Sequence, residues 1–399
     1  MNIPVAESSL RGKRIGFIFG GTALGGGERQ ALVLARHLRA ACRADAQILP
    51  WGVTAFMADI YHQYELPWRA QPFKGWWPAT RTNMVSSLVK YAWAIRRLRM
   101  DLLVSFMMEA NVLAGVVWPW VGAKGCIWNQ VDEGRERHPG RWERLAVRQT
   151  PCFISNSNHG ADFLRDQLGA SRDRVHVVYN GIAPEPATKT GQQWRTELGI
   201  DTDTFVACMV ANLTAFKDHA TLLHAWKIVI EKLAEHNQKA VLLLAGRFGT
   251  QTQPLKLLAY DLDLGRSVRF LGVVKDITGL AECSDLCVFS SRLEGCPNAV
   301  LECMAAGLPV VGTDIPGIRE AVGPDNFEFL APPGDAVLLA AQILLMARDP
   351  VLQQTVGHKN RHRVATVFSV EGMCAQATAL ITSILNTGPA GKSRPQLAG

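Results

Sequence analysis

The 399-residue chain lacks the sequence features of several large protein classes. Its longest apolar run, residues 110–123, is interrupted by Asn111 and Pro119 and is shorter than the roughly 20 residues that span a bilayer. Residues 1–10 are polar and contain no apolar core of a signal peptide. No repeat of solenoid length occurs. We therefore expect a globular protein without a membrane-spanning helix and with a cytoplasmic location.

Cysteine and aspartate spacing gives no sign of a disulfide framework or a metal site. The nine cysteines are irregularly spaced, and Cys283 and Cys287, four residues apart, have no second pair. Asp201-Thr202-Asp203 has the spacing of an Asp-x-Asp motif but precedes the first strand of the second half. We expect buried reduced thiols, no metal and no cofactor.

Positive charge is concentrated in the first half of the chain. Residues 1–183 contain 23 Lys and Arg against 14 Asp and Glu, whereas residues 184–399 contain 19 against 21. Nine of the eleven tryptophans also lie in the first half. Basic residues beside interfacial aromatics suit an anionic membrane surface, and a basic solvated face around core tryptophans is the equal alternative. No nucleic-acid-binding module accompanies the charge, so we expect no nucleic-acid partner.

One segment of the first half combines aromatic and basic side chains. It contains Trp68, Phe73, Trp76, Trp77 and Arg81, and it precedes a predicted amphipathic helix over residues 83–99 that ends in an arginine cluster. We interpret this segment as an acceptor-side or membrane-facing patch, an interpretation that burial of its tryptophans in the core would remove.

Alternating short apolar strands and helices predict two doubly wound α/β domains. Predicted strands lie at residues 15–19, 46–49, 102–106, 125–128 and 152–155, and at residues 205–210, 241–245, 268–271, 286–289, 310–311 and 327–330. Residues 183–191, rich in Pro, Thr and Ala, mark a linker. We assign residues 1–183 and a returning helix at 366–386 to the first domain, residues 184–365 to the second, and residues 387–399 to a disordered tail.

A glycine-rich loop, Gly25-Gly26-Gly27-Glu28, follows the first predicted strand and opens a helix. Glycines let a ligand approach the backbone closely, and amides at a helix start attract anions. The spacing does not match the dinucleotide fingerprint G-x-G-x-x-G with its downstream acid. A Rossmann dehydrogenase is therefore disfavoured.

The most informative segment places two acids, Glu294 and Glu302, on either side of a turn and the start of an apolar helix. The turn and the helix start consist of Gly295, Cys296, Pro297, Asn298, Ala299 and Val300. Pro297 suits a first helical turn, which leaves the three amides after it free to bind an anion. One carboxylate before a phosphate-binding helix and one within it can grip polyol groups on either side of a diphosphate. A nucleotide-sugar has this layout.

This segment resembles the E-x7-E motif of the family-4 retaining glycosyltransferases, which have the GT-B fold. The resemblance continues through Gly307-Leu308-Pro309-Val310-Val311, Gly317-Ile318-Arg319-Glu320 and Phe368-Ser369. It implies two Rossmann-like domains facing a central cleft, the first on the acceptor side and the second binding the donor.

The same resemblance assigns roles to the acids and the glycines. Glu294 would contact the sugar hydroxyls and Glu302 the ribose hydroxyls. Gly26 and Gly27 would close over the sugar-diphosphate, and Glu28 would lie on the acceptor side.

Other positions match or depart from the family pattern. Lys217 matches the lysine that binds the diphosphate, whereas Asn212 stands where relatives carry arginine and can donate hydrogen bonds only without charge. Asn129 or Gln130 stands where relatives often carry a histidine near the reacting sugar, and neither exchanges a proton at neutral pH. Arg247 and Val273 follow strand ends, where ligands bind in open α/β sheets. The main chain at Val273 would read the base.

The implied reaction moves a hexosyl unit, with retention, from a UDP- or GDP-sugar to a hydroxyl of a lipid-linked or oligosaccharide acceptor. The implied setting is cell-surface polysaccharide biosynthesis, in the cytoplasm or at the inner face of the membrane. Lys217 and the helix amides would stabilise the departing diphosphate without a metal. Glu294 is the second catalytic candidate, and a nucleophilic role for it is the less favoured alternative. A sugar-nucleotide epimerase and a non-catalytic nucleotide-sugar-binding protein of this fold remain alternatives, which release of UDP or GDP on turnover would separate.

Overall fold

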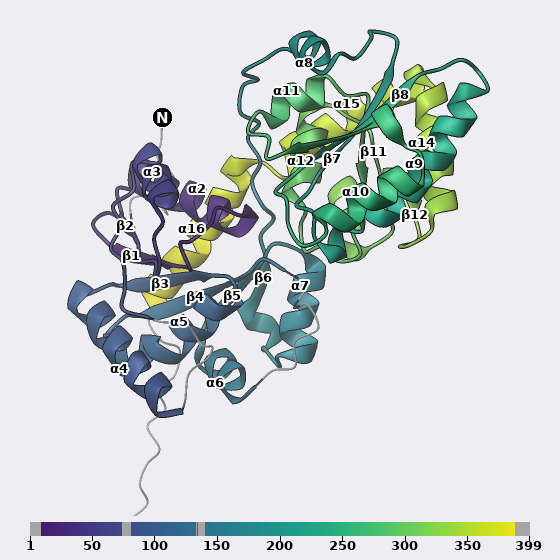
Figure 1. Cartoon of the computed structure of the whole chain (residues 1–399). Coiled ribbons are helices and arrows are strands. Elements are labelled where there is room, and N and C mark those ends of the chain that lie inside the picture. The colour runs from purple at the N-terminus through teal and green to yellow at the C-terminus, as the bar shows by residue number, and fades with distance from the viewer. Residues whose placement is uncertain (1–8, 74–80, 133, 135–139, 388–399) are drawn as a thin grey trace, which may run out of the picture. The chain divides into compact units, whose positions relative to one another are not determined.

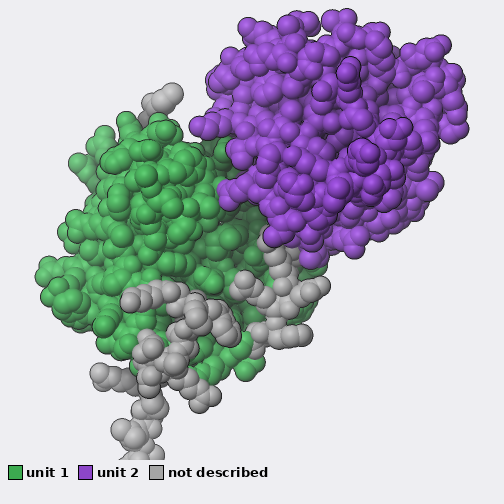
Figure 2. All heavy atoms as spheres, viewed as in Figure 1, with its two compact units in different colours: residues 1–181, 370–399 green, residues 182–369 purple. Residues whose placement is uncertain are grey.

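The computed structural model describes residues 9–73, 81–132, 134 and 140–387 (Figure 1). The chain forms two compact units, which Figure 2 colours separately. Unit 1 comprises the chain up to Gly181 together with the residues from Val370 onward, and unit 2 comprises Ile182–Ser369.

Unit 1 is built on a six-stranded parallel sheet of order β2-β1-β3-β4-β5-β6. Its strands are β1 (Arg14–Ile18), β2 (Asp45–Ile48), β3 (Leu102–Phe106), β4 (Gly125–Gln130), β5 (Cys152–Ser155) and β6 (Val175–Val177). Because β1 pairs with both β2 and β3, the strand order reverses beside β1. Ligands of open α/β sheets bind at the carboxyl ends of the strands near such a reversal.

Helices cover both faces of this sheet and bury a separate core on each face. The described helices are α2 (Gly26–Ala40), α3 (Ala55–Gln63), α4 (Arg81–Leu98), α5 (Met108–Val121), α6 (Arg141–Gln149), α7 (Asn158–Asp162), the π-helical η1 (Phe163–Gln167), the 3-10 turn η2 (Arg172–Arg174) and α16 (Val370–Thr387). Tyr91 of α4 and Leu113 of α5 belong to one core, and Leu32 of α2 and Ile381 of α16 belong to the other. The apolar periodicity of each helix therefore selects the sheet face that it covers.

Unit 2 contains a second six-stranded parallel sheet, of order β12-β11-β10-β7-β8-β9. Its strands are β7 (Phe205–Val210), β8 (Ala240–Ala245), β9 (Val268–Gly272), β10 (Leu286–Phe289), β11 (Val310–Thr313) and β12 (Leu330–Ala331). Its helices are α8 (Gly191–Leu198), η3 (Ala215–Lys217), α9 (His219–Ala234), α10 (Thr252–Asp261), η4 (Gly265–Ser267), α11 (Ile277–Glu282), α12 (Asn298–Ala306), α13 (Pro316–Val322), η5 (Pro324–Phe329), α14 (Ala336–Arg348) and α15 (Pro350–Val367). Here the reversal lies beside β7, which pairs with β8 and β10. The predicted fold class, two doubly wound α/β domains, is confirmed.

One predicted strand, at residues 327–330, is wrong. The 3-10 helix η5 occupies most of this segment, and only Leu330 and Ala331 pair with β11. Pro324 lies at the start of η5, where a proline suits a helix. The side chain of Asn326 donates to the carbonyl of Val322 at 3.1 Å and to Oδ1 of Asn360 at 3.0 Å, which holds the segment in its helical conformation.

The aromatic segment of unit 1 differs from its interpretation as a surface patch. Phe73 is 4% exposed, and its ring lies 5.8 Å from that of Tyr91. Trp68 is partly buried against the core beside Tyr61. For Phe73 the interpretation is therefore wrong, because the core covers it, whereas Trp68 keeps part of its surface exposed and its role stays a prediction. Trp76, Trp77 and the side chain of Arg81 lie outside the described residues.

The predicted linker is partly anchored to unit 2. Residues 182–190 form neither helix nor strand, but the carboxylate of Asp276 accepts hydrogen bonds from the amides of Thr188 and Lys189, both at 3.1 Å, and from Trp194 Nε1 at 3.0 Å. Burial alone would raise the pKa of Asp276, but these bonds outweigh it and lower the pKa to about 2. The second part of the linker therefore belongs structurally to unit 2.

Residues Pro350–Thr387 are long and apolar enough to cross a membrane, by length and composition alone. They form two helices, α15 and α16, with a break at Phe368 and Ser369. Met373 and Ile381 of α16 are buried in the core of unit 1. This burial identifies α16 as a core helix, and the expectation that the chain does not cross a membrane stays a prediction.

Candidate functional site

The loops after β7, β8 and β9 meet at the carboxyl-end edge of the sheet in unit 2. The amide of Gly246 donates to the carbonyl of Gly272 at 2.7 Å, and a Cβ on Gly246 would overlap the carbonyl of Ala211. The amide of Arg247 donates to Oδ1 of Asn212 at 3.0 Å. Asn212 and Arg247, both predicted site residues, are thus brought together, and glycine is required where the backbones touch.

Val273 lies at the same edge of the sheet. It directly follows Gly272, the last residue of β9, and the residue is 67% exposed. Val273 thus lies at the strand end where ligands of such sheets bind.

Lys217 and Glu294, 77 residues apart in sequence, form an ion pair at this edge. Their side chains are only 16% and 9% exposed. The ammonium also lies 5.0 Å from the ring centre of Phe289 and 5.5 Å from that of Phe216, within cation–π distance. Removing one partner of such a shielded pair costs about 3–5 kcal/mol, because the other charge is left buried. The structure therefore holds a cation and a carboxylate in fixed contact. The carboxylate, that of Glu294, lies four residues before the start of α12.

Asp218 follows Lys217 in the chain, and its structural role was not predicted from the sequence. Its backbone is left-handed, with φ of 50°, which is unfavourable for a residue other than glycine. Its carboxylate caps α9 through Thr221 and accepts a bond from Arg292 Nε at 2.8 Å. The hydroxyl of Ser290 donates to the carbonyl of Asp218 at 3.0 Å and to that of Lys217 at 3.1 Å. These contacts join the β7 and β10 loops and fix the backbone that carries Lys217.

His219 begins α9, two residues after Lys217, and is 1% exposed. Burial, assisted by the positive charge of Lys217, lowers the pKa of His219 to about 4. The imidazole is therefore neutral at pH 7 and adds no charge to the site.

The predicted anion-binding helix exists, and it begins one residue later than expected. Pro297 is the residue before α12, whose first residue is Asn298. The amide of Val300 donates to the carbonyl of Pro297 at 3.0 Å, so the prediction of a free amide at Val300 is wrong. Gly295 is buried, whereas the partly exposed residues of this segment are Cys296, Asn298, Ala299 and Glu302. The backbone of Glu294 and Gly295 packs closely on Gly317, so that a Cβ on Gly317 would overlap their carbonyls. Gly317 thus fixes the approach of α13 to the loop.

In unit 1 the glycine loop opens α2 at Gly26. Glu28 caps this helix, because its Oε2 accepts a bond from the amide of Gly25 at 3.1 Å. Burial raises the pKa of the Glu28 carboxyl, although the hydrogen bond from Gly25 opposes the shift. A Cβ on Gly27 would lie 3.2 Å from Val131 and 3.3 Å from the sulfur of Met107, which places this glycine against the carboxyl ends of β3 and β4.

Asn129 and Gln130 end β4 and are 5% and 2% exposed. Asn129 Nδ2 donates to the carbonyl of Ser105 at 3.0 Å. The Gln130 side chain accepts from Trp128 Nε1 at 2.9 Å and donates to Asp132 Oδ1 at 2.7 Å. With Gln30 they line a cavity of about 30 Å³, which is large enough for a single water molecule. Both amides are occupied by the protein itself, and contact with an acceptor stays a prediction.

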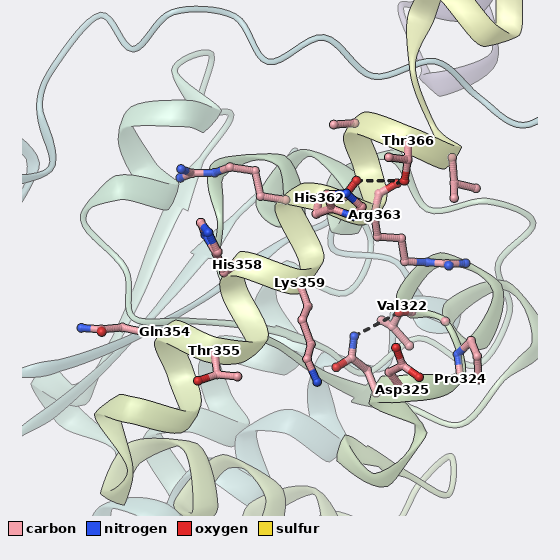
Figure 3. Close-up of a pocket in the computed structure, with 15 residues that line it drawn as sticks. Val322, Pro324, Asp325, Gln354, Thr355, His358, Lys359, His362, Arg363 and Thr366 are labelled. Carbon is pink, nitrogen blue, oxygen red and sulfur yellow. Dashed lines mark hydrogen bonds between the residues drawn. The ribbon is translucent and has the colours of Figure 1, made fainter.

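A much larger hollow, of about 1020 Å³, lies elsewhere in unit 2 along α15 (Figure 3). Its lining is basic and includes His358, Lys359, Arg361, His362 and Arg363. Arg361 donates to the carbonyl of Ala306 at 2.7 Å, and Arg363 donates to those of Glu320 and Ala321 at 2.8 Å. These arginines satisfy the last carbonyls of α12 and α13, which is the usual role of cations at helix C-termini. The hollow thus adjoins the end of α12 that is opposite to Glu294.

Two family profiles match the chain and together cover both units. The family described as Glycosyltransferase Family 4 matches residues 24–186, and the family described as Glycosyl transferases group 1 matches residues 191–363. Among curated relatives, the N-acetyl-alpha-D-glucosaminyl L-malate synthase of Bacillus anthracis is 26% identical over 62% of this chain and 64% of its own length. The UDP-Gal:alpha-D-GlcNAc-diphosphoundecaprenol alpha-1,3-galactosyltransferase of Escherichia coli is 26% identical over 58% and 60%. The matches thus span less than two thirds of these relatives.

Solved structures match nearly the whole chain at lower identity. Anabaena HepE, in complex with UDP and glucose, has a TM-score of 0.80 at 21% identity and covers 93% of this chain and 100% of its own. The sucrose-phosphate synthase of Thermosynechococcus elongatus has a TM-score of 0.72 at 18% identity over 94% and 100%. Identities this low establish the fold alone. The two family profiles, which together match residues 24–186 and 191–363, show that the chain belongs to the family 4 glycosyltransferases, and the solved structures and the two parallel sheets show that it has the GT-B fold of two Rossmann-like domains.

Proposed function

We propose that the protein transfers a hexosyl unit from a UDP-sugar to a hydroxyl of a lipid-linked or oligosaccharide acceptor, with retention of anomeric configuration. The main support for the proposal is the largely buried Lys217–Glu294 ion pair, in which Glu294 lies four residues before the start of α12. The UDP and UDP-glucose bound to HepE, which has this fold, favour a UDP-sugar over other donors.

In the proposed reaction the bond between the anomeric carbon and the diphosphate oxygen breaks, and its electron pair leaves with UDP. Lys217 and the amides at the start of α12 stabilise the negative charge that grows on the leaving group. The acceptor hydroxyl attacks from the same face and gives its proton to the departing phosphate. Glu294, held by Lys217, binds the sugar hydroxyls, and Glu302 binds the ribose.

The remaining predicted residues complete the donor site in this proposal. Asn212 and Arg247 bind the diphosphate side of the donor, and the main chain at Val273 binds the base. In unit 1, Gly26 and Gly27 bind the sugar-diphosphate, and Glu28, Asn129 and Gln130 lie on the acceptor side. We propose that no metal takes part, since Lys217 and the helix amides supply the positive charge that a metal would otherwise bring.

The proposed setting is the synthesis of a cell-surface polysaccharide or glycolipid, in the cytoplasm or peripherally on the inner face of the membrane. The Escherichia coli relative acts, by its name, on a diphosphoundecaprenol-linked sugar. An acceptor of this kind is embedded in a bilayer, so peripheral contact with an anionic membrane is part of the proposal.

A thermal-shift screen over UDP-, GDP- and ADP-sugars tests the donor. A ligand that binds only the folded protein raises its melting temperature. At a ligand concentration a hundred times Kd, the free energy of unfolding rises by about 2.7 kcal/mol. Stabilisation by UDP-sugars, followed by UDP release when an acceptor is added, would support a transferase. Binding with interconversion of the donor but no UDP release would show an epimerase instead, and binding without any turnover would show a non-catalytic protein.

A further inference from the structure

α4 presents a second apolar face to solvent. Val85, Val89 and Trp93 are 51%, 58% and 56% exposed, and their spacing of four residues places them on one side of the helix. Tyr91 and Ile95, on the opposite side, are fully buried in the core. Burial within unit 1 therefore does not explain the exposed apolar residues.

The end of α5 extends this surface. Trp120 is 51% exposed, and Arg96 Nη1 of α4 donates to its carbonyl at 2.8 Å. The guanidinium carbon of Arg97 lies 3.3 Å from the ring centre of Trp93. Figure 1 shows α4 and α5 packed on the same face of the sheet. The α4–α5 patch is defined here as Val85, Val89, Lys90, Trp93, Arg96, Arg97 and Trp120.

All charges of the patch have one sign. α4 contains no Asp or Glu, and neither do residues 110–124. A symmetric dimer through this face would place the cations of both copies opposite each other, which is unfavourable. Aliphatic side chains, tryptophan and arginine on one helix face are instead the composition of a surface that lies at the headgroups of an anionic bilayer.

We propose that the α4–α5 patch binds an anionic membrane surface. Val85, Val89, Trp93 and Trp120 enter the boundary between headgroups and acyl chains, while Lys90, Arg96 and Arg97 contact lipid phosphates. This inference rests on the proposed function, because a membrane-embedded acceptor is the reason for the enzyme to bind a membrane. Vesicle binding without donor or acceptor tests the two separately.

The test is co-sedimentation of the full chain with vesicles of equal parts phosphatidylglycerol and phosphatidylcholine, and with vesicles of phosphatidylcholine alone. We expect binding to the anionic vesicles that weakens with salt. Val89→Ser combined with Trp93→Ser should lower the partition coefficient about tenfold or more, through lost apolar burial. Lys90→Gln should lower it about fivefold on anionic vesicles and leave it unchanged on neutral ones.

Control variants separate the patch from exposed apolar residues in general. Val337→Ser combined with Val351→Ser removes two residues of unit 2 that are 67% and 74% exposed, and this pair should bind vesicles like the wild type. Each variant must keep the wild-type melting temperature, which shows that it is folded without reference to the donor. Equal binding by wild type and Val89→Ser/Trp93→Ser would overturn the proposal, as would absence of wild-type binding. A dimer that dissociates in Val89→Ser/Trp93→Ser would overturn it in favour of a second copy.

Discussion

In unit 2 the loops after β7 and β10 hold two ion pairs, Lys217–Glu294 and Asp218–Arg292, whereas among the described residues of unit 1 the end of β4 carries the neutral amides of Asn129 and Gln130, which are bonded to the protein itself. The two sheets share one architecture, so the difference arises from the loops. We infer that unit 2 provides the electrostatic part of the proposed reaction and that unit 1 provides shape. Four substitutions test this contrast.

The largest effect is expected for Lys217→Met. Loss of the ammonium removes the main cation proposed to stabilise the departing diphosphate, so kcat should fall by about 10²–10³-fold. The rate of UDP release measures this. Lys227→Met, in the surface pair with Glu231, serves as the matched control and should keep full activity. A Lys217→Met enzyme that is fully folded and fully active would disprove the electrostatic role of unit 2.

A smaller effect is expected for Glu302→Ala. Hydrogen bonds to a charged group contribute about 1.5–3 kcal/mol, so the affinity for the donor should fall about ten- to hundredfold. Isothermal titration with the UDP-sugar selected by the screen measures the change, with Glu282→Ala on an exposed part of α11 as the control. Unchanged affinity in Glu302→Ala would remove Glu302 from the ribose site.

A pH effect is expected from His219, whose pKa is lowered to about 4. Below its ordinary pKa of about 6.5, the unfolded chain binds a proton that the folded protein rejects. Stability should therefore fall as the pH drops from about 6.5 towards 4, with a contribution of up to about 1.4 kcal/mol per pH unit. Denaturant unfolding at several pH values measures the slope of the free energy of unfolding against pH. The wild type and the control His224→Gln, at an exposed position of the same helix, should show this slope, and His219→Gln should show a shallower one. Equal slopes in all three would show that His219 is protonated in the folded protein.

The smallest effect is expected for Gln130→Ala. This side chain carries no charge and binds Trp128 and Asp132, so kcat/KM should change less than about tenfold. The pH–rate profile should keep its shape, because glutamine does not titrate. A shifted profile would show that unit 1 takes part in proton transfer and would weaken the contrast between the two units.

Much of the fold could be predicted because its strands are buried apolar runs with clear ends. β3, β5, β7 and β10 span the predicted residues for this reason. The segment at residues 327–330 could not be assigned from its apolar residues, because the bonds of Asn326 to Val322 and Asn360 decide its conformation. Exposed and buried tryptophans also could not be distinguished by composition. Trp68 packs on the core, and Trp93 faces solvent.

The sequence predicted individual residues of the candidate site, but it did not predict how they contact one another. Glu294, Lys217 and the start of α12 followed from spacing and resemblance. Their ion pair depends on how two loops fold together across 77 residues of sequence, and on Asp218, Ser290 and Arg292, which carry no local signal for this role. Val300 shows the same limit, since a single turn of backbone geometry decides which amide is free.

Gly246 and Gly317 determine where this site can change in evolution or in the laboratory. At both positions even one methyl group would overlap a neighbouring carbonyl, so these sites are closed to substitution without moving a loop. Arg247 follows Gly246, Val273 follows Gly272, whose carbonyl accepts a hydrogen bond from Gly246, and both residues are exposed. Libraries that seek a new sugar or base preference should therefore vary Arg247 and Val273 and keep the two glycines fixed.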